Sequence, residues 1–145
     1  MTVAGRRRCA VLGSPVAHSL SPVLHRAAYA QLGLDWTYDA IDVTEADLAT
    51  FLDGLDESWR GLSVTMPLKQ AAASLATQRS ALVTTIGAAN TLLLDRDARS
   101  AENTDVSGMR SALTEAGVGS VSRASVLGSG STALAALAAL ATMTD

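Results

Sequence analysis

Short apolar runs alternate with segments of helical periodicity along most of this chain. The runs at residues 9–12, 36–43 and 61–65 are predicted to be strands, because each is short, apolar and bounded by turn-forming or polar residues. Residues 90–94 and 98–102 flank the polar segment 95–97 and predict a hairpin. This alternation is typical of an α/β domain with a largely parallel sheet.

Capping residues mark where the helices begin and end. Ser21 is predicted to cap a helix that has Pro22 in its first position and that ends at Gly33. Three more helices are expected where hydroxyl, proline or acidic residues precede apolar stripes. They cover residues 44–55, 67–78 and 105–116.

The last part of the chain has a different organisation. Residues 125–127 are predicted to form a short strand, followed by a glycine turn and a helix rich in alanine and leucine. Such a unit opens a mononucleotide-binding fold, which is then incomplete. We therefore expect a three-layer domain with a mostly parallel sheet flanked by helices at residues 1–104. A connecting helix at 105–117 and the first βα unit of a truncated Rossmann-like domain at 118–145 follow.

Composition argues against several classes of protein. A net charge of −3 and 3% aromatic residues disfavour nucleic-acid binding, which needs a basic face and stacking rings. One cysteine and two histidines argue against a metal site, and the lone cysteine fits a reducing compartment. The apolar run after Arg6-Arg7-Arg8 is too short for a signal peptide, and residues 133–141 are too few to span a membrane. We therefore expect a soluble, cytoplasmic protein with no membrane partner.

The chain contains ten arginines but a single lysine, Lys69. A guanidinium stays charged in proteins, whereas an ammonium can give up and regain a proton. Lys69 follows the strand at 61–65 and falls in the first turn of the helix that Pro67 is expected to open. A solvated surface lysine and an acid–base group both fit this position, so its neighbours must decide between them.

Polar residues near the start of the chain form a first candidate site. Ser19 and Ser21 lie at a predicted helix N-terminus, where hydroxyl and backbone N–H groups can bind a carboxylate. The same two serines also suit turn formation and helix capping. His18 has no partner visible in the sequence, and we expect it to be structural.

Further polar residues follow later strands. Thr65 lies four residues before Lys69, and Asn90 opens a strand with an amide suited to holding a hydroxyl. Asp105 can either cap the helix that follows it or hold a lysine ammonium and exchange protons with it. These residues fall at strand ends or helix starts, where α/β sheets bind ligands.

A G-x-G-x-x-A turn links the last predicted strand to the last predicted helix. Its glycines permit a tight turn and the close approach of a pyrophosphate to the helix N-terminus. The candidate cofactor-binding residues are Gly128, Ser129, Gly130, Ser131, Thr132 and Ala133. The acidic or basic residue that would choose between dinucleotide cofactors lies about 20 residues further on, beyond the last residue of this chain.

In this order, these segments resemble the shikimate dehydrogenase family, NADP-dependent enzymes of aromatic amino-acid (chorismate) biosynthesis. The matching segments are residues 11–22, 63–69, 86–92, 103–105 and the glycine turn at Gly128. The resemblance covers the family's N-terminal substrate domain and only the start of its NADP-binding domain.

The resemblance implies a role for each matching residue. The substrate carboxylate is implied to bind Ser19 and Ser21. The substrate hydroxyls are implied to bind Thr65, Asn90 and Asp105. Lys69 and Asp105 are implied to be the catalytic pair, in which Lys69 exchanges a proton with the substrate oxygen while NADP carries the hydride.

Two departures from the family pattern leave alternatives open. Ser63 stands where the family often has asparagine, and most of the cofactor domain lies outside these 145 residues, which we expect to be inactive alone. The implied reaction is the NADPH-dependent reduction of 3-dehydroshikimate to shikimate. The alternatives are a quinate or shikimate dehydrogenase that uses NAD, and a non-catalytic fragment that binds the substrate. The sequence does not decide between a monomer and a homodimer.

Overall fold

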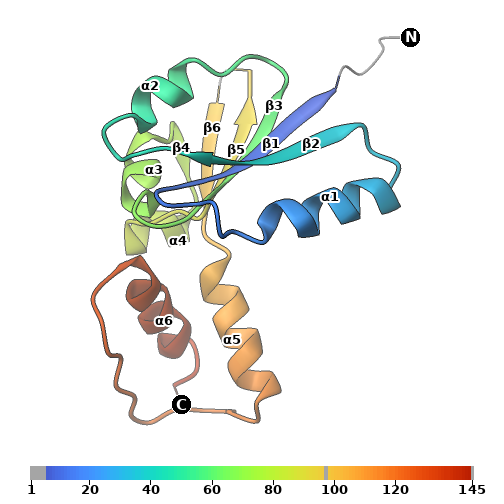
Figure 1. The fold of residues 1–145 in the computed structure, drawn as a ribbon. Helices are drawn as coiled ribbons and strands as arrows, with labels where there is room; N and C mark the ends of the chain where they lie inside the picture. The colour runs from blue at the N-terminus through green and yellow to red at the C-terminus, as the bar shows by residue number, and fades with distance from the viewer. Residues whose placement is uncertain (1–5, 97, 145) are drawn as a thin grey trace.

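The computed structural model describes residues 6–96 and 98–144. Strands and helices alternate along most of this length, as the sequence predicts (Figure 1). In chain order they are β1 (Arg7–Gly13), α1 (Ser21–Gln31), β2 (Trp36–Asp42), α2 (Leu48–Asp53), β3 (Trp59–Val64), α3 (Lys69–Leu75), β4 (Gln78–Arg79), α4 (Ala81–Ile86), β5 (Thr91–Asp95), β6 (Ala98–Glu102), α5 (Asp105–Glu115) and α6 (Ser131–Ala141).

The strands form one mixed sheet in the order β2-β1-β3-β5-β6-β4. β1 is parallel to both of its neighbours, β2 and β3, and β4 is parallel to β6. The hairpin β5–β6 is antiparallel and joins the sheet antiparallel to β3. The mostly parallel α/β sheet and the hairpin are therefore both confirmed.

Side chains of β1 are buried alternately on the two faces of the sheet, because successive side chains on a strand point to opposite faces. Ala10 and Leu12 belong to the main core, which also takes in apolar side chains of α2, α3 and α4. Cys9 and Val11 face the other way and pack in a smaller cluster that is covered by α1. Figure 1 shows α1 on one side of the sheet and α2 and α3 on the other, which confirms the three layers.

Several helix boundaries differ from the predictions. α1 begins at Ser21, but Leu20 occupies the cap position and no described side chain caps this helix. The helix of Lys69 begins at that residue rather than near Pro67, and it ends at Leu75 because Ala76 is extended. The chain after it joins the sheet as β4, which the sequence did not predict.

The sequence analysis did not predict α4, although a serine precedes this helix and a glycine follows it. The Ser80 side chain accepts a hydrogen bond from the Val83 N–H at 3.3 Å, which caps the N-terminus. Gly87 ends the helix with a left-handed φ of 67°, a conformation that glycine adopts without strain. The helix has only six residues, too few to show a clear apolar periodicity.

The strand predicted at residues 125–127 is wrong. No part of segment 118–130 pairs with a strand of the described sheet, and Leu127 is 98% exposed. A strand needs a hydrogen-bonded neighbour, and this segment instead crosses from α5 to α6 as an irregular loop. The division into residues 1–104, 105–117 and 118–145 remains a prediction.

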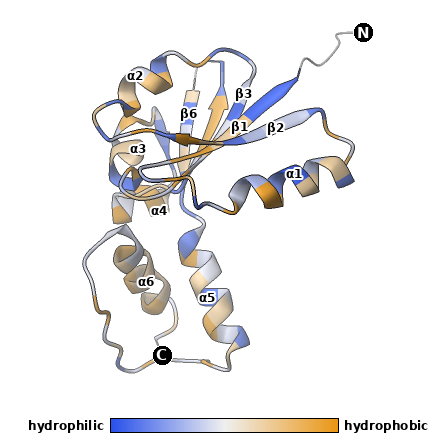
Figure 2. Cartoon of the chain, viewed as in Figure 1, coloured by the Kyte–Doolittle hydropathy of each residue, from blue (hydrophilic) through white to orange (hydrophobic). Residues whose placement is uncertain are grey.

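α5 and α6 lie side by side beyond one edge of the sheet (Figure 1). Val106 of α5 packs with Ala135 and Ala139 of α6, and partly buried residues of α4 join this cluster. Figure 2 shows that α6 is apolar around most of its circumference. Among residues 6–96 and 98–144, no helix is both long enough and apolar enough to cross a membrane.

Leu92 and Leu93 are neighbours on β5 whose side chains point to opposite faces of the sheet. Leu92 is fully buried, whereas Leu93 is 53% exposed. We expect Leu92→Ala to lower the free energy of unfolding by about 2–5 kcal/mol, because it leaves a cavity in the core. Leu93→Ala should change it by about 0.5 kcal/mol or less. Urea denaturation followed by circular dichroism measures both, and equal losses would contradict the register of β5.

Candidate active site

The carboxyl ends of β1 and β3 lie together at one edge of the sheet. The loops that follow these strands are tied to each other by backbone hydrogen bonds: Thr65 N–H donates to the Leu12 carbonyl at 2.9 Å, and Ser14 N–H donates to the Met66 carbonyl at 3.2 Å. Because these contacts are made by the backbone, they fix the loop positions independently of any ligand. This edge therefore presents a preformed surface.

A cavity of about 340 Å³ opens at this edge. It collects side chains from four separate stretches of the chain: the loop before α1, the β3–α3 turn, the start of β5 and the start of α5. All six residues predicted to contact substrate line it. Its lining comprises Val11, Val16, His18, Ser19, Ser21, Ser63, Val64, Thr65, Lys69, Asn90, Thr91, Thr104 and Asp105.

Lys69 and Asp105 form an ion pair in this cavity. The Lys69 Nζ lies 2.6 Å from Asp105 Oδ2, and the two side chains are only 14% and 25% exposed. Each is the first residue of its helix, Lys69 of α3 and Asp105 of α5. The carboxylate is favoured at a helix N-terminus and the ammonium is disfavoured, so the pair offsets the unfavourable placement of the lysine. The surface-lysine alternative does not fit this geometry.

Asn90 holds the other oxygen of Asp105. Its Nδ2 donates to Asp105 Oδ1 and to Thr104 Oγ1, both at 2.8 Å. Its Oδ1 accepts from the Thr91 hydroxyl at 2.9 Å and from the Thr104 N–H at 3.0 Å. The Asp105 carboxylate is thus fixed from both sides, by an ammonium on one oxygen and an amide on the other.

Asn103, rather than Asp105, accepts a side-chain hydrogen bond from the start of α5. The Asn103 side chain is 6% exposed, and its Oδ1 accepts a hydrogen bond from the Asp105 N–H at 3.0 Å. Its Nδ2 donates to the Ala88 carbonyl at 3.0 Å. The first N–H of α5 is therefore bonded to Asn103, while the Asp105 carboxylate lines the cavity.

Ser19 and Ser21 also line the cavity. Ser19 Oγ accepts a hydrogen bond from the Ser21 N–H at 3.3 Å, and the Ser19 N–H donates to the Val16 carbonyl at 2.9 Å. His18, expected to be structural, also lines the cavity. The cavity thus combines serine hydroxyl groups with a lysine–carboxylate pair. It suits a small, polar, anionic ligand that exchanges a proton.

Three hydroxyl-bearing side chains in the lining were not predicted as site residues: Ser63, Thr91 and Thr104. Thr104 lies within the polar segment 103–105, and Thr91 directly follows Asn90, so adjacency to a candidate was the only sequence signal for either. Ser63 lies on β3 opposite Val11 of β1. A single serine inside a predicted strand carries no signal of its own, and only its place in the segment 63–69 that resembles the family drew attention to it.

The glycine turn lies outside this cavity. Gly128 has a φ of 126° and Gly130 occupies the cap position of α6, whose first turn is capped by no described side chain. The six described residues from Gly128 to Ala133 are not part of the cavity lining. The turn and the helix start are as predicted, but the strand that should precede them is absent from the described segment 118–130.

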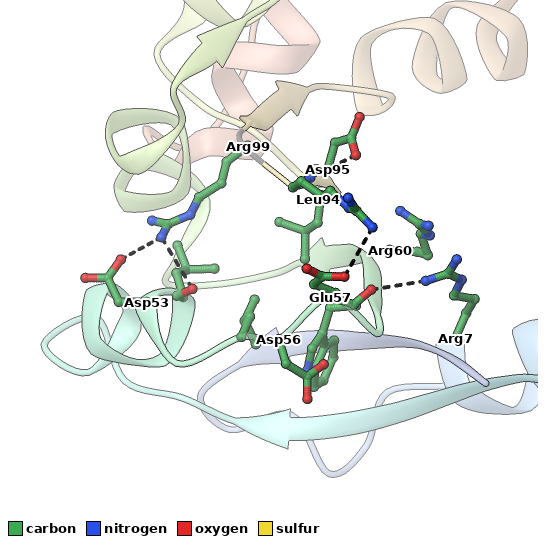
Figure 3. A pocket seen from close by; sticks show the side chains of 12 residues that line it. Arg7, Asp53, Asp56, Glu57, Arg60, Leu94, Asp95 and Arg99 are labelled. Atoms are coloured by element: carbon green, nitrogen blue, oxygen red, sulfur yellow. Dashed lines mark hydrogen bonds and ion pairs between the residues drawn. The ribbon is translucent and has the colours of Figure 1, made fainter. Parts of the chain in front are cut away.

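A second and larger cavity, of about 440 Å³, lies at the opposite edge of the sheet (Figure 3). Four arginines and four carboxylates line it, so its charges balance. Arg99 pairs with Asp53 at 2.6 Å and Arg96 with Glu57 at 3.5 Å. Its charged groups largely neutralise one another, and none of the predicted site residues reaches it.

Within residues 6–96 and 98–144, no three His, Cys, Asp or Glu side chains are placed to hold a metal ion.

Comparison with known proteins identifies relatives over most of the chain. A family profile described as "Shikimate dehydrogenase substrate binding domain" matches residues 11–92. Shikimate dehydrogenase (NADP(+)) of Anaeromyxobacter sp. (strain K) is 44% identical over 131 residues, which are 90% of this chain and 47% of the relative. The chain thus spans about half the length of this relative.

Solved structures give the same match. The crystal structure of Mycobacterium tuberculosis shikimate dehydrogenase superposes with a TM-score of 0.84 at 45% identity, covering 95% of this chain and 51% of that one. A Thermus thermophilus shikimate 5-dehydrogenase in complex with NADP(H) and shikimate gives a TM-score of 0.86 at 39% identity. That match covers 94% of this chain and 52% of the Thermus chain.

Gly13, the last residue of β1, lies directly against the β3–α3 turn. A Cβ at this position would overlap Thr65 Cγ2 and lie 3.1 Å from the Met66 carbonyl oxygen. We expect Gly13→Ala to lower the free energy of unfolding by about 1–3 kcal/mol through overpacking, and to shift the Thr65 methyl resonance. Gly108→Ala in α5, where nothing lies within 4 Å, should instead raise it by about 0.5–1 kcal/mol. Denaturation curves measure the change in the free energy of unfolding for each variant, and methyl NMR spectra detect the shift at Thr65. A change of the same sign in the two variants would contradict the prediction.

Proposed function

The chain belongs to the shikimate dehydrogenase family, whose substrate-binding domain it contains, and we propose that it supplies the substrate site of an NADP-dependent shikimate dehydrogenase. The proposed reaction is the reversible reduction of 3-dehydroshikimate to shikimate. The observation that carries the proposal is the Lys69–Asp105 ion pair at 2.6 Å inside the cavity at the carboxyl edge of the sheet.

The polarity of the cavity fits a hydroxylated ring that bears a carboxylate. Ser19 and Ser21 present hydroxyl groups beside the start of α1, and these would hold the carboxylate. Thr65, Asn90 and Asp105 present an alcohol, an amide and a carboxylate, which would contact the substrate hydroxyls. The Asn90 amide already bonds Asp105, Thr91 and Thr104, so Asn90 would exchange one of these hydrogen bonds for one to the substrate. Val11, Val16 and Val64 supply apolar wall for the ring carbons.

Lys69 is proposed to be the acid–base group. In reduction, the Lys69 ammonium gives a proton to the substrate oxygen as the ketone becomes an alcohol, and in oxidation Lys69 takes that proton back. Asp105 holds the ammonium at 2.6 Å and keeps it oriented, while Asn90 fixes Asp105. Arginine at position 69 would keep the charge but could not exchange the proton, which accounts for a lone lysine among ten arginines.

NADP would be held in part by the glycine turn. The positive φ of Gly128 requires glycine, and the uncapped first turn of the described helix α6 leaves backbone N–H groups available for a pyrophosphate. These features fit the start of a dinucleotide site. When bound, the nicotinamide of such a cofactor supplies or accepts the hydride. The residues of this chain bind and orient the substrate and move its proton.

Titration with shikimate, followed by heteronuclear NMR of the chain, tests the binding step. We expect saturable shifts at Ser19, Ser21, Lys69 and Asp105, because these residues line one cavity. Arg60→Ala, at the opposite cavity, should bind shikimate with unchanged affinity. A dispersed spectrum without shifts, or shifts confined to the cavity of Arg60, would contradict a substrate site in this chain.

Substitution of Lys69 tests the chemical step in the protein together with its cofactor domain. We expect Lys69→Ala to reduce turnover on the order of 10²- to 10⁴-fold while changing the KM for shikimate little, since general acid–base catalysis is lost. Lys69→Arg should also lose turnover despite its retained positive charge. Steady-state kinetics with shikimate and NADP measure both. Near-normal turnover in either variant would refute the proposed role of Lys69.

A further inference from the structure

Tyr38 lies directly behind the wall of the substrate cavity. It is on β2 and is 2% exposed, and its hydroxyl oxygen is 2.6 Å from Ser63 Oγ on β3. In the sheet, Tyr38 pairs with Cys9 of β1 and Ser63 pairs with Val11 of the same strand. Neighbouring strands are about 4.8 Å apart, so the Tyr38 side chain reaches across β1 to touch a residue two strands away.

The Tyr38 ring is held in place from the side of α1. The imidazole of His25 stacks on it with ring centroids 3.9 Å apart and an interplanar angle of 14°. Arg26 Nε donates to the Tyr38 carbonyl at 2.7 Å, and its Nη2 bonds Asp39 Oδ1 at the same distance. The ring therefore has a fixed position relative to both β2 and α1. A side chain fixed in this way can set the orientation of a neighbouring hydroxyl.

The direction of the Tyr38–Ser63 hydrogen bond decides what Ser63 can do. The phenol is the more acidic of the two hydroxyls, so it is the donor and Ser63 Oγ is the acceptor. A serine hydroxyl has one proton, and with its oxygen already accepting from behind, that proton is left to point into the cavity. Ser63 lines the cavity, whereas Tyr38 is sealed from it.

Tyr38 keeps its proton near neutral pH. Burial raises the pKa of its hydroxyl above the ordinary value, and hydrogen bonds with Ser63 and Ser21 lower it by a smaller amount. Ser21 lies near the same ring, because the His25 imidazole that stacks on Tyr38 is also 2.9 Å from the Ser21 carbonyl oxygen. Ser63 and Ser21 both line the cavity and both lie close to the Tyr38 side chain.

We propose that Tyr38 is a positioning residue that fixes Ser63 as a hydrogen-bond donor, beside Ser21, to the carboxylate of the substrate. This inference rests on the proposed function and extends it by one binding residue, Ser63, and one supporting residue, Tyr38. The carboxylate takes no part in the reaction, so the contact stabilises ground state and transition state alike. Its loss should weaken binding without slowing the chemical step.

Tyr38→Phe tests this inference because it removes only the hydroxyl and keeps the ring. We expect the affinity of the chain for shikimate, measured by calorimetry or NMR titration, to fall about tenfold, the value of one hydrogen bond to a charged group. The affinity for shikimate methyl ester, which lacks the negative charge, should change less than about twofold. In the protein with its cofactor domain, KM for shikimate should rise by a similar factor while kcat stays within about twofold.

Tyr29→Phe is the matched control. Tyr29 lies in the same apolar cluster, with its ring centroid 6.5 Å from that of Tyr38, but it is not part of the cavity lining. Tyr29→Phe should leave both affinities unchanged. An equal loss of affinity for acid and ester in Tyr38→Phe, or an equal effect of Tyr29→Phe, would show a general packing role and overturn the inference.

A measurement without ligand tests the hydrogen bond itself. Ser63→Ala removes a group that lowers the pKa of Tyr38, so that pKa should rise further, as followed by the ¹³Cζ resonance of labelled tyrosine. An unchanged titration of Tyr38 would overturn the inference. Failure of the unsubstituted chain to bind shikimate would instead refute the proposed function, and with it the ligand role of Tyr38. Binding that Tyr38→Phe leaves intact would refute the role of Tyr38 alone.

Discussion

The parallel pairing of β1 with both β2 and β3 is the constraint on which the site depends. Parallel strands end at the same edge of a sheet, so the loops after β1 and β3 are brought together there. β5 is antiparallel to β3 and therefore starts at that edge, and β6 is antiparallel to β5 and therefore returns to it. Asn90 precedes β5 and Asp105 follows β6, so the hairpin delivers both side chains to the place where Lys69 begins α3.

This topology brings the Lys69 ammonium, which the N-terminus of α3 disfavours, to a carboxylate that the N-terminus of α5 favours. An ammonium at the start of α3 opposes the helix dipole, and its carboxylate partner comes from 36 residues later in the sequence. Because both groups are largely shielded from water, removing either one would leave the other poorly solvated. The ion pair therefore links the β3–α3 turn to the start of α5, and the same link provides the proposed acid–base pair.

The sequence predicted those parts of the molecule that local rules determine. Apolar patterning and turn residues located the first three strands, the β5–β6 hairpin and α5, whereas β4 and α4 are too short for a periodic signal. The prediction of a strand at 125–127 was wrong, because a strand needs a hydrogen-bonded neighbouring strand and no strand of the described sheet pairs with these residues. The six predicted contact residues lie at strand ends or helix starts and surround one cavity. Ser63 and Tyr38 lie inside strands, and their relation depends on register across three strands, which no local pattern encodes.

The two cavities show that shape alone does not identify a site. The larger cavity holds four arginines, yet an anion entering it would meet as many carboxylates, and two of the arginines are already paired with them. In the smaller cavity the single lysine and the single aspartate neutralise each other, and the remaining polar groups in the lining are uncharged side chains with His18. Hydroxyl and amide groups can turn donors or acceptors toward a ligand without separating an ion pair. A neutral set of oriented hydroxyls is therefore better suited than a cluster of self-paired arginines to accept a small anionic substrate.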